Sequence, residues 1–283
     1  MSLDVSVIIV SWKVKDRLRA NLSALLPSLN GLSAEVFVVD NNSRDGSAEM
    51  VSKEFSTVRL IANQENLGFA KANNQAIKEA KGDFILLLNP DMLVFPDTVK
   101  NMLAWMKTNQ QAVVAGCRLE NESGERLPSV RRFPRLSDQL AIVLKFPHLF
   151  PSWLNSYLCK NFDYSQAARV DSVRGAFFMI NRAAWQNISA SALPLLDERY
   201  FIWFEEVDFC RQVYKNGGEV WYTPVARCLD YVGQSFNQVG VSNKQLYFQD
   251  SMLKYFQKWE PSWQCFVLKS AWPLGRFLAK IFS

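Results

Sequence analysis

One aspartate, Asp91, follows the most apolar stretch of the sequence, the run Phe84–Leu88. Asn89 and Pro90 precede it as favoured turn residues, and apolar residues resume directly after it. A carboxylate at the end of a buried strand costs several kcal/mol unless it is paired with another charge, hydrogen-bonded or bound to a metal ion. The position of Asp91 therefore predicts a balancing partner, and a divalent cation is one such partner.

Three more carboxylates, Glu205, Glu206 and Asp208, fall in the first turn of a predicted helix, in the stretch FEEVDFCRQVYKNGG. Acids at this end of a helix complement its dipole, which is the simpler interpretation. Three acids exceed what the dipole requires, however, and the aromatic residues around them predict a low-dielectric pocket. Burial there raises the pKa of a carboxylate and suits a general base. The pattern does not decide which of the three would be the base.

The elements that must position these acids alternate along the first part of the chain. Apolar runs predict strands, and residues with helical spacing between them predict helices. The predicted strands cover 5–11, 35–41, 58–62, 83–89 and 111–119, and the predicted helices cover 14–29, 45–55, 68–82 and 97–107. Gly82 is the expected end of the third helix and Gly217 of the helix that carries the acids. Strands and helices in alternation predict an α/β fold with a mostly parallel sheet.

Polar residues follow four of the predicted strands. They are Ser11, Asp40 to Asn42, Asn63 to Asn66, and Asn89 to Asp91. Turn preference explains each of them alone. Ligands of parallel sheets bind beyond the carboxyl ends of the strands, so four polar ends at one edge predict a ligand site there.

The composition excludes several classes of protein. The 283 residues are 49% hydrophobic and 21% charged, which fits one large globular domain or two small ones. Five scattered cysteines predict reduced thiols in the cytoplasm, and a single histidine, His148, excludes a His-rich zinc site and disfavours a Ser-His-Asp triad. Neither a dinucleotide fingerprint nor a phosphate-binding P-loop occurs, and we expect no signal peptide and no membrane-spanning segment. The net charge of +5 fits an anionic ligand or a membrane surface, and a solvated surface explains it almost as well.

Six blocks of the sequence, in this order, resemble family-2 glycosyltransferases with the GT-A fold, and most of all the rhamnosyltransferase-like group. The blocks are VSVIIVSWK, VFVVDNNSRDGS, NQENLGFAKANNQAI, FILLLNPDMLV, GAFFMINRAAW and LDERYFIWFEEVDFCRQVYKNGGEVWYTP. The match runs from about residue 4 to 235. It implies a catalytic domain over residues 1–235, with a nucleotide-sugar half (1–118) and an acceptor half (119–235), followed by a helical extension over 236–283.

The resemblance also implies roles for individual residues. Asp40 would hold the nucleotide base, and Asp91 would bind the Mg²⁺ or Mn²⁺ ion that bridges the diphosphate of the donor. Glu205 and Glu206 would include the base that takes a proton from the acceptor hydroxyl, in one displacement with inversion. The remaining donor-side residues are Ser11, Asn42, Asn66, Gly68, Asn73 and Asn89.

This sequence departs from the family pattern at three of these positions. Asn89 stands where many relatives have a second aspartate, which should weaken the metal site. Glu206 stands where an aspartate is usual, so the base could be Glu205, Glu206 or Asp208. Asp230 replaces a usual histidine and is either a compensating metal ligand or a turn residue. Because of these departures, a non-catalytic nucleotide-sugar-binding protein remains an alternative. A nucleotidyltransferase is a further alternative, but the sequence does not contain the Gly-rich loop that such an enzyme needs.

Two parts lie outside the resemblance. The segment 128–170 includes the basic cluster RRFPR and the aromatic run KFPHLFPSWLNSYL, where acceptor contacts or plain packing are both expected. The tail from residue 261 is basic and apolar, which fits either an anionic membrane surface or packing on the domain, and Pro273 is expected to break its helix. The expected partners are a nucleotide-sugar, a saccharide or lipid-linked saccharide acceptor and the inner face of the membrane, and no nucleic acid.

Overall fold

A computed structural model of the chain describes residues 3–231, 233 and 238–281. The boundary that the sequence predicts between 235 and 236 lies outside the described residues. Strands and helices alternate through the first half, as the periodicity predicts. They are β1 (Leu3–Ser11), α1 (Lys15–Ser28), β2 (Ala34–Asp40), α2 (Ser47–Glu54), β3 (Arg59–Ala62), α3 (Phe69–Glu79), β4 (Gly82–Leu88), β5 (Met92–Val94), α4 (Thr98–Thr108) and β6 (Ala112–Glu120). The expected end of α3 at Gly82 is wrong, because Ala80 ends the helix and Gly82 begins β4.

The second half adds shorter elements and three long helices. They are β7 (Arg126–Leu127), β8 (Val130–Arg131), α5 (Leu136–Val143), a 3-10 turn (Phe146–His148), β9 (Ala168–Arg169), β10 (Ser172–Val173), β11 (Phe177–Asn181), α6 (Arg182–Ile188), α7 (Glu205–Lys215), β12 (Glu219–Asp230), α9 (Val241–Trp259) and α10 (Ser262–Ile281). The expected stop at Gly217 is confirmed, since α7 ends just before it and Gly217 has a left-handed φ of 80°.

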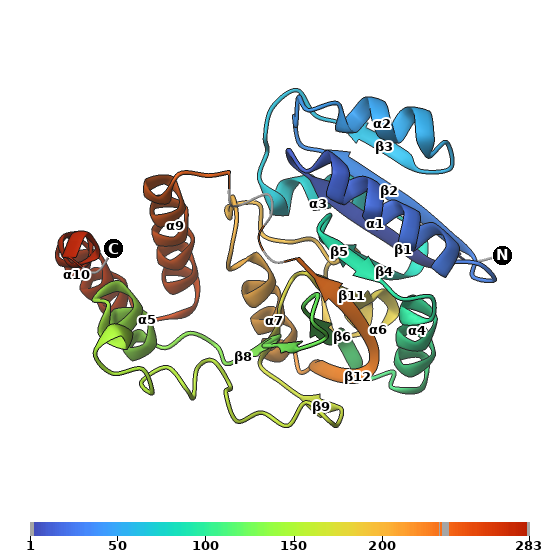
Figure 1. Cartoon of the computed structure of the whole chain (residues 1–283). Coiled ribbons are helices and arrows are strands. Elements are labelled where there is room, and N and C mark those ends of the chain that lie inside the picture. Colours follow the sequence, from blue (N-terminus) through green and yellow to red (C-terminus); the bar gives the residue numbers. More distant parts are fainter. Residues whose placement is uncertain (1–2, 232, 234–237, 282–283) are drawn as a thin grey trace.

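The main sheet has the strand order β3-β2-β1-β4-β11-β6-β12-β5 (Figure 1). β1, β2, β3 and β4 pair in parallel, and β12 pairs in parallel with β6. β11 lies antiparallel between β4 and β6, so β6 and β12 run in the same direction as β1. The carboxyl ends of β1, β2, β4 and β12 therefore meet at one edge of the sheet. This edge is where the sequence predicts the ligand site.

Two hydrophobic clusters cover the two faces of the sheet. Alternate residues of a strand point to opposite faces, and in β1 Val7 and Ile9 join one cluster while Ile8 and Val10 join the other. The first cluster includes residues of α1 and α4, and the second includes residues of α3, α6 and α7. Because both faces of the sheet are buried, β1 and β4 read as continuous apolar runs.

The last two helices, α9 and α10, pack against the preceding part of the chain. A third buried cluster joins α5, α9 and α10 to Tyr200 and Phe204, which precede α7. Figure 1 shows α5, α9 and α10 together at the end of the molecule opposite β3 and α2. No helix in the described part of the chain is long and apolar enough to cross a membrane.

The expectation that Pro273 breaks the tail helix is wrong, because α10 runs from Ser262 to Ile281 with Pro273 inside it. A proline inside a helix removes one backbone hydrogen bond, to the carbonyl four residues earlier. Both Pro273 and the residue that carries that carbonyl, Lys269, are exposed. Water can therefore reach this turn of the helix, which lowers the cost of the missing bond.

Candidate active site

The topology places Asp91 and Asp230 side by side at the predicted edge. Asp230 ends β12 and lies opposite Met92 of β5, and the backbone N–H of Tyr231 donates to the carbonyl of Asp91 at 3.2 Å. Both aspartates are buried, although they lie 139 positions apart in the sequence. Asn89 is fixed beside them, because its backbone N–H donates to Ala176 and its carbonyl accepts from the side chain of Asn21.

A cavity of 430 Å³ opens at this edge of the sheet. Six of the predicted site residues line it: Asn66, Gly68, Asn89, Asp91, Glu205 and Glu206. The other predicted residues, Ser11, Asp40, Asn42, Asn73, Asp208 and Asp230, do not line it. Aromatic side chains form much of the rest of the wall, namely Trp12, Phe69, Phe201, Trp203 and Tyr247.

Asp40 and Ser11 are buried at the ends of neighbouring strands. One carboxylate oxygen of Asp40, Oδ2, accepts from the backbone N–H of Ser43 at 3.1 Å. The other, Oδ1, has no hydrogen-bond partner among the described residues, and neither has the hydroxyl of Ser11. Buried polar atoms are nearly always paired in folded proteins. Two unpaired atoms at adjacent strand ends fit a site that binds the polar edge of a ligand.

Asn42 and Asn73 have local partners instead. Asn42 adopts a left-handed φ of 60°, and its side chain accepts from the guanidinium of Arg44 at 2.9 Å. Asn73 is buried within α3, where its amide donates to the carbonyl of Phe69 at 2.9 Å. Asn42 and Asn73 therefore bond to neighbouring residues of the chain and do not line the cavity.

Asn41 is a site residue that the sequence analysis did not single out. Its side-chain oxygen accepts from the backbone N–H of Leu67 at 3.0 Å, and its amide donates to Asn66 at 2.8 Å and to the carbonyl of Gly68. Asn41 thus holds the loop that leads into α3 against the end of β2. Asn41 lies between Asp40 and Asn42, so its position within this run of polar residues was the feature of the sequence that could have identified it as a site residue.

Gly68 locks the start of α3 to the segment that precedes α7. It has a left-handed φ of 81°, and a Cβ there would lie 2.9 Å from the Cα of Phe201. The next residue, Phe69, donates its backbone N–H to the carbonyl of Phe201 at 2.7 Å. A side chain at position 68 would separate these segments, and glycine is the residue that accepts this conformation without strain.

The turn before α7 places Glu205 and Glu206 on the cavity wall. Trp203 and Phe204 both adopt left-handed φ angles, 66° and 68°, which cost non-glycine residues about 1–3 kcal/mol each. Such strain persists only where the surrounding structure imposes it, and here Phe204 lies in the third buried cluster. The strained turn is therefore held by packing on one side and presents two carboxylates on the other.

The two glutamates have different electrostatic surroundings. Burial, and next the charge of Glu206, raise the pKa of Glu205 well above its usual value, and its Oε2 has no hydrogen-bond partner among the described residues. Burial also raises the pKa of Glu206, but the positive charges of Arg131 and Arg174 oppose that rise. Glu206 is thus the carboxylate whose ionised form has the better support.

Asp208 is not brought to the cavity. Its carboxylate accepts hydrogen bonds from four side chains: Tyr200, Gln212, Lys258 and Trp259. Burial raises the pKa of Asp208, although Lys258 and Trp259 act in the opposite direction. Two of the four donors belong to α9, so this aspartate fastens α9 to α7 and has no free acceptor position for a substrate.

Arg174 is a second residue that the sequence analysis missed. It lines the cavity, and its guanidinium lies 3.1 Å from Asp230. Its backbone N–H donates to the carbonyl of Ser129, which fixes it beside β8 and β10. The sequence offered little signal for it, because Arg174 stands just before the block GAFFMINRAAW and contacts Asp230 only through the folded sheet.

The residues at this edge fit a divalent cation that takes most of its ligands from a diphosphate and water. Within the described ranges, no three His, Cys, Asp or Glu residues form a group that could enclose a metal ion alone. Asp91 offers one carboxylate to the cavity and Asn89 one neutral oxygen, while Asp230 already pairs with Arg174. Mg²⁺ is commonly held by one or two carboxylates together with substrate phosphates, so this small set is sufficient.

Comparisons with known proteins give the family. The sequence model of Glycosyl transferase family 2 matches residues 6–186. The chain is 26% identical over 213 residues to N-acetylglucosaminyl-diphospho-decaprenol L-rhamnosyltransferase of Mycobacterium tuberculosis, covering 71% of this chain and 67% of that protein. It is 24% identical over 237 residues to the rhamnosyltransferase WbbL of Escherichia coli, covering 80% of this chain and 83% of that one.

Solved structures show the same fold. The mannosyltransferase PcManGT of Pyrobaculum calidifontis, in complex with GDP-Man and Mn²⁺, superposes with a TM-score of 0.59 at 16% identity, covering 98% of this chain and 74% of that one. TarS 1-349 of S. aureus in complex with UDP-GlcNAc gives a TM-score of 0.57 at 17% identity, covering 89% of this chain and 65% of that one. The chain belongs to glycosyl transferase family 2 and is a rhamnosyltransferase-like glycosyltransferase with the GT-A fold.

Proposed function

We propose that this protein transfers a sugar, with inversion, from a nucleotide-sugar to a hydroxyl of a lipid-linked saccharide used in the bacterial cell envelope. The observation that carries the proposal is the cavity itself, which brings Asp91 and Asn89 together with Glu205 and Glu206 on its wall. The two relatives described above are rhamnosyltransferases, and the name of one of them specifies a diphospho-decaprenol acceptor. These names support L-rhamnose as the donor sugar, and we propose dTDP as its carrier.

Donor binding would use both the buried and the exposed residues of the sheet edge. The unpaired oxygen of Asp40 and the hydroxyl of Ser11 would accept from or donate to the base and ribose. Asn66 and Gly68, which line the cavity, would contact the nucleotide. The diphosphate would lie against Asp91. A divalent cation held there would neutralise charge on the leaving diphosphate.

Arg174 adds a fixed positive charge on the same side of the cavity, where it already faces Asp230. A cation aimed at the position where negative charge grows stabilises the transition state without reorganisation. We propose that Arg174 contributes to leaving-group stabilisation, and that Asp230 orients it rather than acting mainly as a metal ligand.

Proton removal from the acceptor hydroxyl is assigned to Glu206. An effective base must be ionised at the working pH, and Arg131 and Arg174 support the ionised form of Glu206. Glu205 has the more strongly raised pKa and would remain protonated, as a hydrogen-bond donor beside it. The hydroxyl oxygen would attack the anomeric carbon as Glu206 takes its proton and the nucleoside diphosphate leaves from the opposite face.

Transfer activity tests the proposal directly. We expect the purified protein with Mn²⁺ to use dTDP-L-rhamnose in a donor panel, with the product detected by mass on a lipid-linked GlcNAc acceptor. Asp91→Asn should abolish turnover, whereas Asp83→Asn, at an exposed position of β4, should not change it. Full turnover of Asp91→Asn in EDTA would refute the metal assignment. Donor binding without any transfer or hydrolysis would instead support a non-catalytic descendant.

A further inference from the structure

The helix α9 lies between α7 and α10 (Figure 1), and it follows the part of the chain that the family model matches, residues 6–186. One side of α9 contacts the segment 197–204, which leads into the two glutamates of the cavity. The contacts come from residues spaced three or four positions apart, so they share one face of the helix. These residues are Tyr247, Ser251, Lys254 and Lys258. A stripe with this spacing indicates that α9 holds the segment along several turns.

The two lysines of the stripe fix the start of the segment. Lys258 donates to the carboxylate of Asp197 at 2.9 Å, and Lys254 donates to the backbone carbonyl of Arg199 at 2.6 Å. Hydrogen bonds with a charged donor are stronger than those between neutral groups. These two bonds therefore set the register of α9 on the segment, and the preceding turns of the helix meet the residues directly before the glutamates.

Ser251 acts on the turn itself. It is only 1% exposed, and its hydroxyl donates to the backbone carbonyl of Ile202 at 2.8 Å. Ile202 directly precedes Trp203 and Phe204, the two residues with left-handed φ angles. Because a peptide unit is planar, a carbonyl that is held in place also fixes the orientation of the N–H of the next residue. The hydroxyl of Ser251 thus restrains the backbone at the point where the strained turn begins.

Aromatic rings of α9 also pack on the turn. The ring of Phe248 lies 6.2 Å from that of Trp203 and 5.6 Å from that of Phe204, measured between centroids. Tyr247 stacks on Phe201 with centroids 4.8 Å apart, and both rings line the cavity. Left-handed residues other than glycine persist only where their surroundings impose the conformation. Here α9 supplies both a hydrogen bond and aromatic packing to impose it.

We propose that α9 positions the base of the reaction, and that Ser251 is the positioning residue on which this depends. With the carbonyl of Ile202 held, Trp203 and Phe204 keep their left-handed conformations, and the first turn of α7 presents Glu206 to the acceptor hydroxyl. Without this bond the turn can relax, and the carboxylate moves away from the place where it accepts the proton. This inference rests on the proposed function, since it explains how the chain holds the proposed base.

The transfer kinetics of Ser251→Ala test this, with Ser28→Ala as the matched control. Ser28 is also a buried serine whose hydroxyl donates to a backbone carbonyl, that of Leu25 at 2.7 Å, but it lies at the end of α1. We expect both variants to lose a similar amount of stability. Ser251→Ala should lower kcat about tenfold or more with the KM for the donor unchanged, because a misplaced catalytic group slows the reaction without weakening donor binding. Ser28→Ala should keep the kcat of the unmodified protein.

Combining Ser251→Ala with Glu206→Gln separates positioning from general loosening of the fold. Once the base is removed its position no longer matters, so Ser251→Ala should lower the remaining turnover of Glu206→Gln by no more than about twofold. A loss as large as in the unmodified background would overturn the proposal, and so would equal kcat values for Ser251→Ala and Ser28→Ala.

Failure of the proposed function gives a different result in the same measurements. The unmodified protein would then transfer no sugar, or Glu206→Gln would keep full turnover. Either result would overturn the positioning role together with the function, whereas a normal kcat of Ser251→Ala would overturn the positioning role alone.

Discussion

Glu205 and Glu206 are neighbours in the chain, yet the fold gives them different electrostatic surroundings. Glu205 is 4% exposed, and its pKa is raised by burial and by the adjacent charge. Glu206 is less deeply buried and has two arginines that oppose the rise. The ionised form is therefore better supported at Glu206 than at Glu205.

Substituting the acids one at a time would test this division. Glu206→Gln keeps the shape but removes the proton acceptor, so turnover should fall by about 10²–10⁴ while donor affinity stays nearly constant. Glu205→Gln should have a smaller effect. Initial rates at saturating donor, with donor affinity from calorimetry, would measure both. If Glu206→Gln remained active and Glu205→Gln were inactive but folded, the base would be Glu205.

The raised pKa of Glu205 also predicts how stability depends on pH. The folded protein keeps a proton on Glu205 at pH values where the unfolded chain has released it. Its contribution to stability is therefore complete below the unfolded pKa, near 4.5, and is lost as the pH rises through the folded pKa. Glu205→Gln removes that loss, so its melting temperature should exceed that of the unmodified protein at pH 8 and match it closely at pH 4.5.

Thermal unfolding followed by circular dichroism at several pH values would measure the difference. Glu122→Gln, at an exposed loop position, is the control and should shift the melting temperature at neither pH. A Glu205→Gln variant that is less stable at pH 8 than at pH 4.5, relative to the unmodified protein, would show that Glu205 is ionised and paired in the folded state.

At the scale of elements, the strands and helices of the first half could be predicted from the sequence, because each depends on the pattern of residues within its own segment. Apolar runs such as Phe84–Leu88 identify strands buried on both faces, and the spacing of apolar residues identifies the helices between them. The placement of β11 between β4 and β6 was not readable, since it depends on pairing across nearly a hundred residues. Arg174 was missed for the same reason, because its partner Asp230 lies in β12, far from it in the sequence.

Asp208 shows how a correct local pattern can mislead about a role. Three acids at a helix start looked alike in sequence, but the partners that distinguish Asp208 are Lys258 and Trp259, about fifty positions away in α9. The helical tail was predicted, and one face of it packs on the domain. The continuity of α10 through Pro273 was not predicted, because it depends on which side of the helix faces solvent.

The link between α7 and α9 makes a prediction about stability. Asp208 is buried and pairs with Lys258 at 2.6 Å, and Lys258 also lies 2.9 Å from Asp197. Removing Asp208 leaves the hydroxyl of Tyr200 and the indole N–H of Trp259 without this acceptor, at about 1–3 kcal/mol each and about 2–6 kcal/mol together, while Lys258 keeps Asp197 as its partner. Asp208→Ala should lower the free energy of unfolding by that amount in urea. Asp250→Ala, which removes an exposed pair on the same α9, should cost about 0–1 kcal/mol.

Activity of the folded fraction separates this role from a chemical one. A milder variant, Asp208→Asn, keeps one acceptor oxygen and with it two of the four hydrogen bonds. It should retain turnover per folded molecule close to that of the unmodified protein. A loss of turnover of about a hundredfold or more with unchanged stability would return Asp208 to the list of possible bases.

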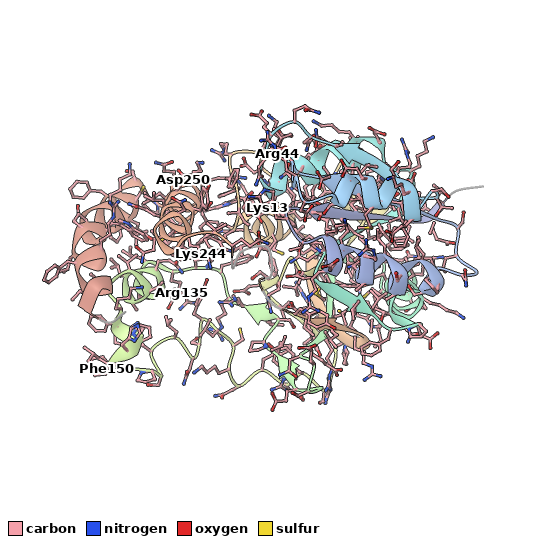
Figure 2. The ribbon with its side chains drawn as sticks, turned by 45° about the horizontal axis from the view of Figure 1, so that its top comes forward. Lys13, Arg44, Arg135, Phe150, Lys244 and Asp250 are labelled. Atoms are coloured by element: carbon pink, nitrogen blue, oxygen red, sulfur yellow. The ribbon has the colours of Figure 1, made fainter. Side chains whose placement is uncertain are left out.

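On the scale of the whole molecule, exposed apolar side chains gather at one end. Four apolar side chains of α10 are more than half exposed, namely Trp263, Phe266, Leu274 and Phe277. Three more in the segment after α5 are also more than half exposed: Leu149, Phe150 and Trp153. Figure 2 shows Phe150 at the same end of the molecule as α10, opposite the N-terminal half. Lys269 and Arg276 lie on α10 beside its apolar side chains. Clusters of this kind mark interaction surfaces, and bulky apolar residues next to cations fit an anionic bilayer.

The exposed apolar side chains at this end would be the part of the molecule that contacts a bilayer surface. We therefore predict that the protein sediments with liposomes containing anionic lipid, and less with purely zwitterionic ones or at high salt. Removing the tail is a poor test of this, because Cys265, Leu268 and Trp272 belong to the third buried cluster.

Surface substitutions on α10 test the prediction while sparing that cluster. The triple variant Phe266→Ser, Leu274→Ser and Phe277→Ser changes only exposed positions, so it should stay folded and lose most of its sedimentation with anionic liposomes. Val225→Ser, an exposed apolar position on β12, is the control and should sediment as the unmodified protein does. Transfer to a soluble acceptor should be unchanged in both, because neither touches the cavity. If the triple variant sedimented fully, the exposed face of α10 would not be the membrane contact.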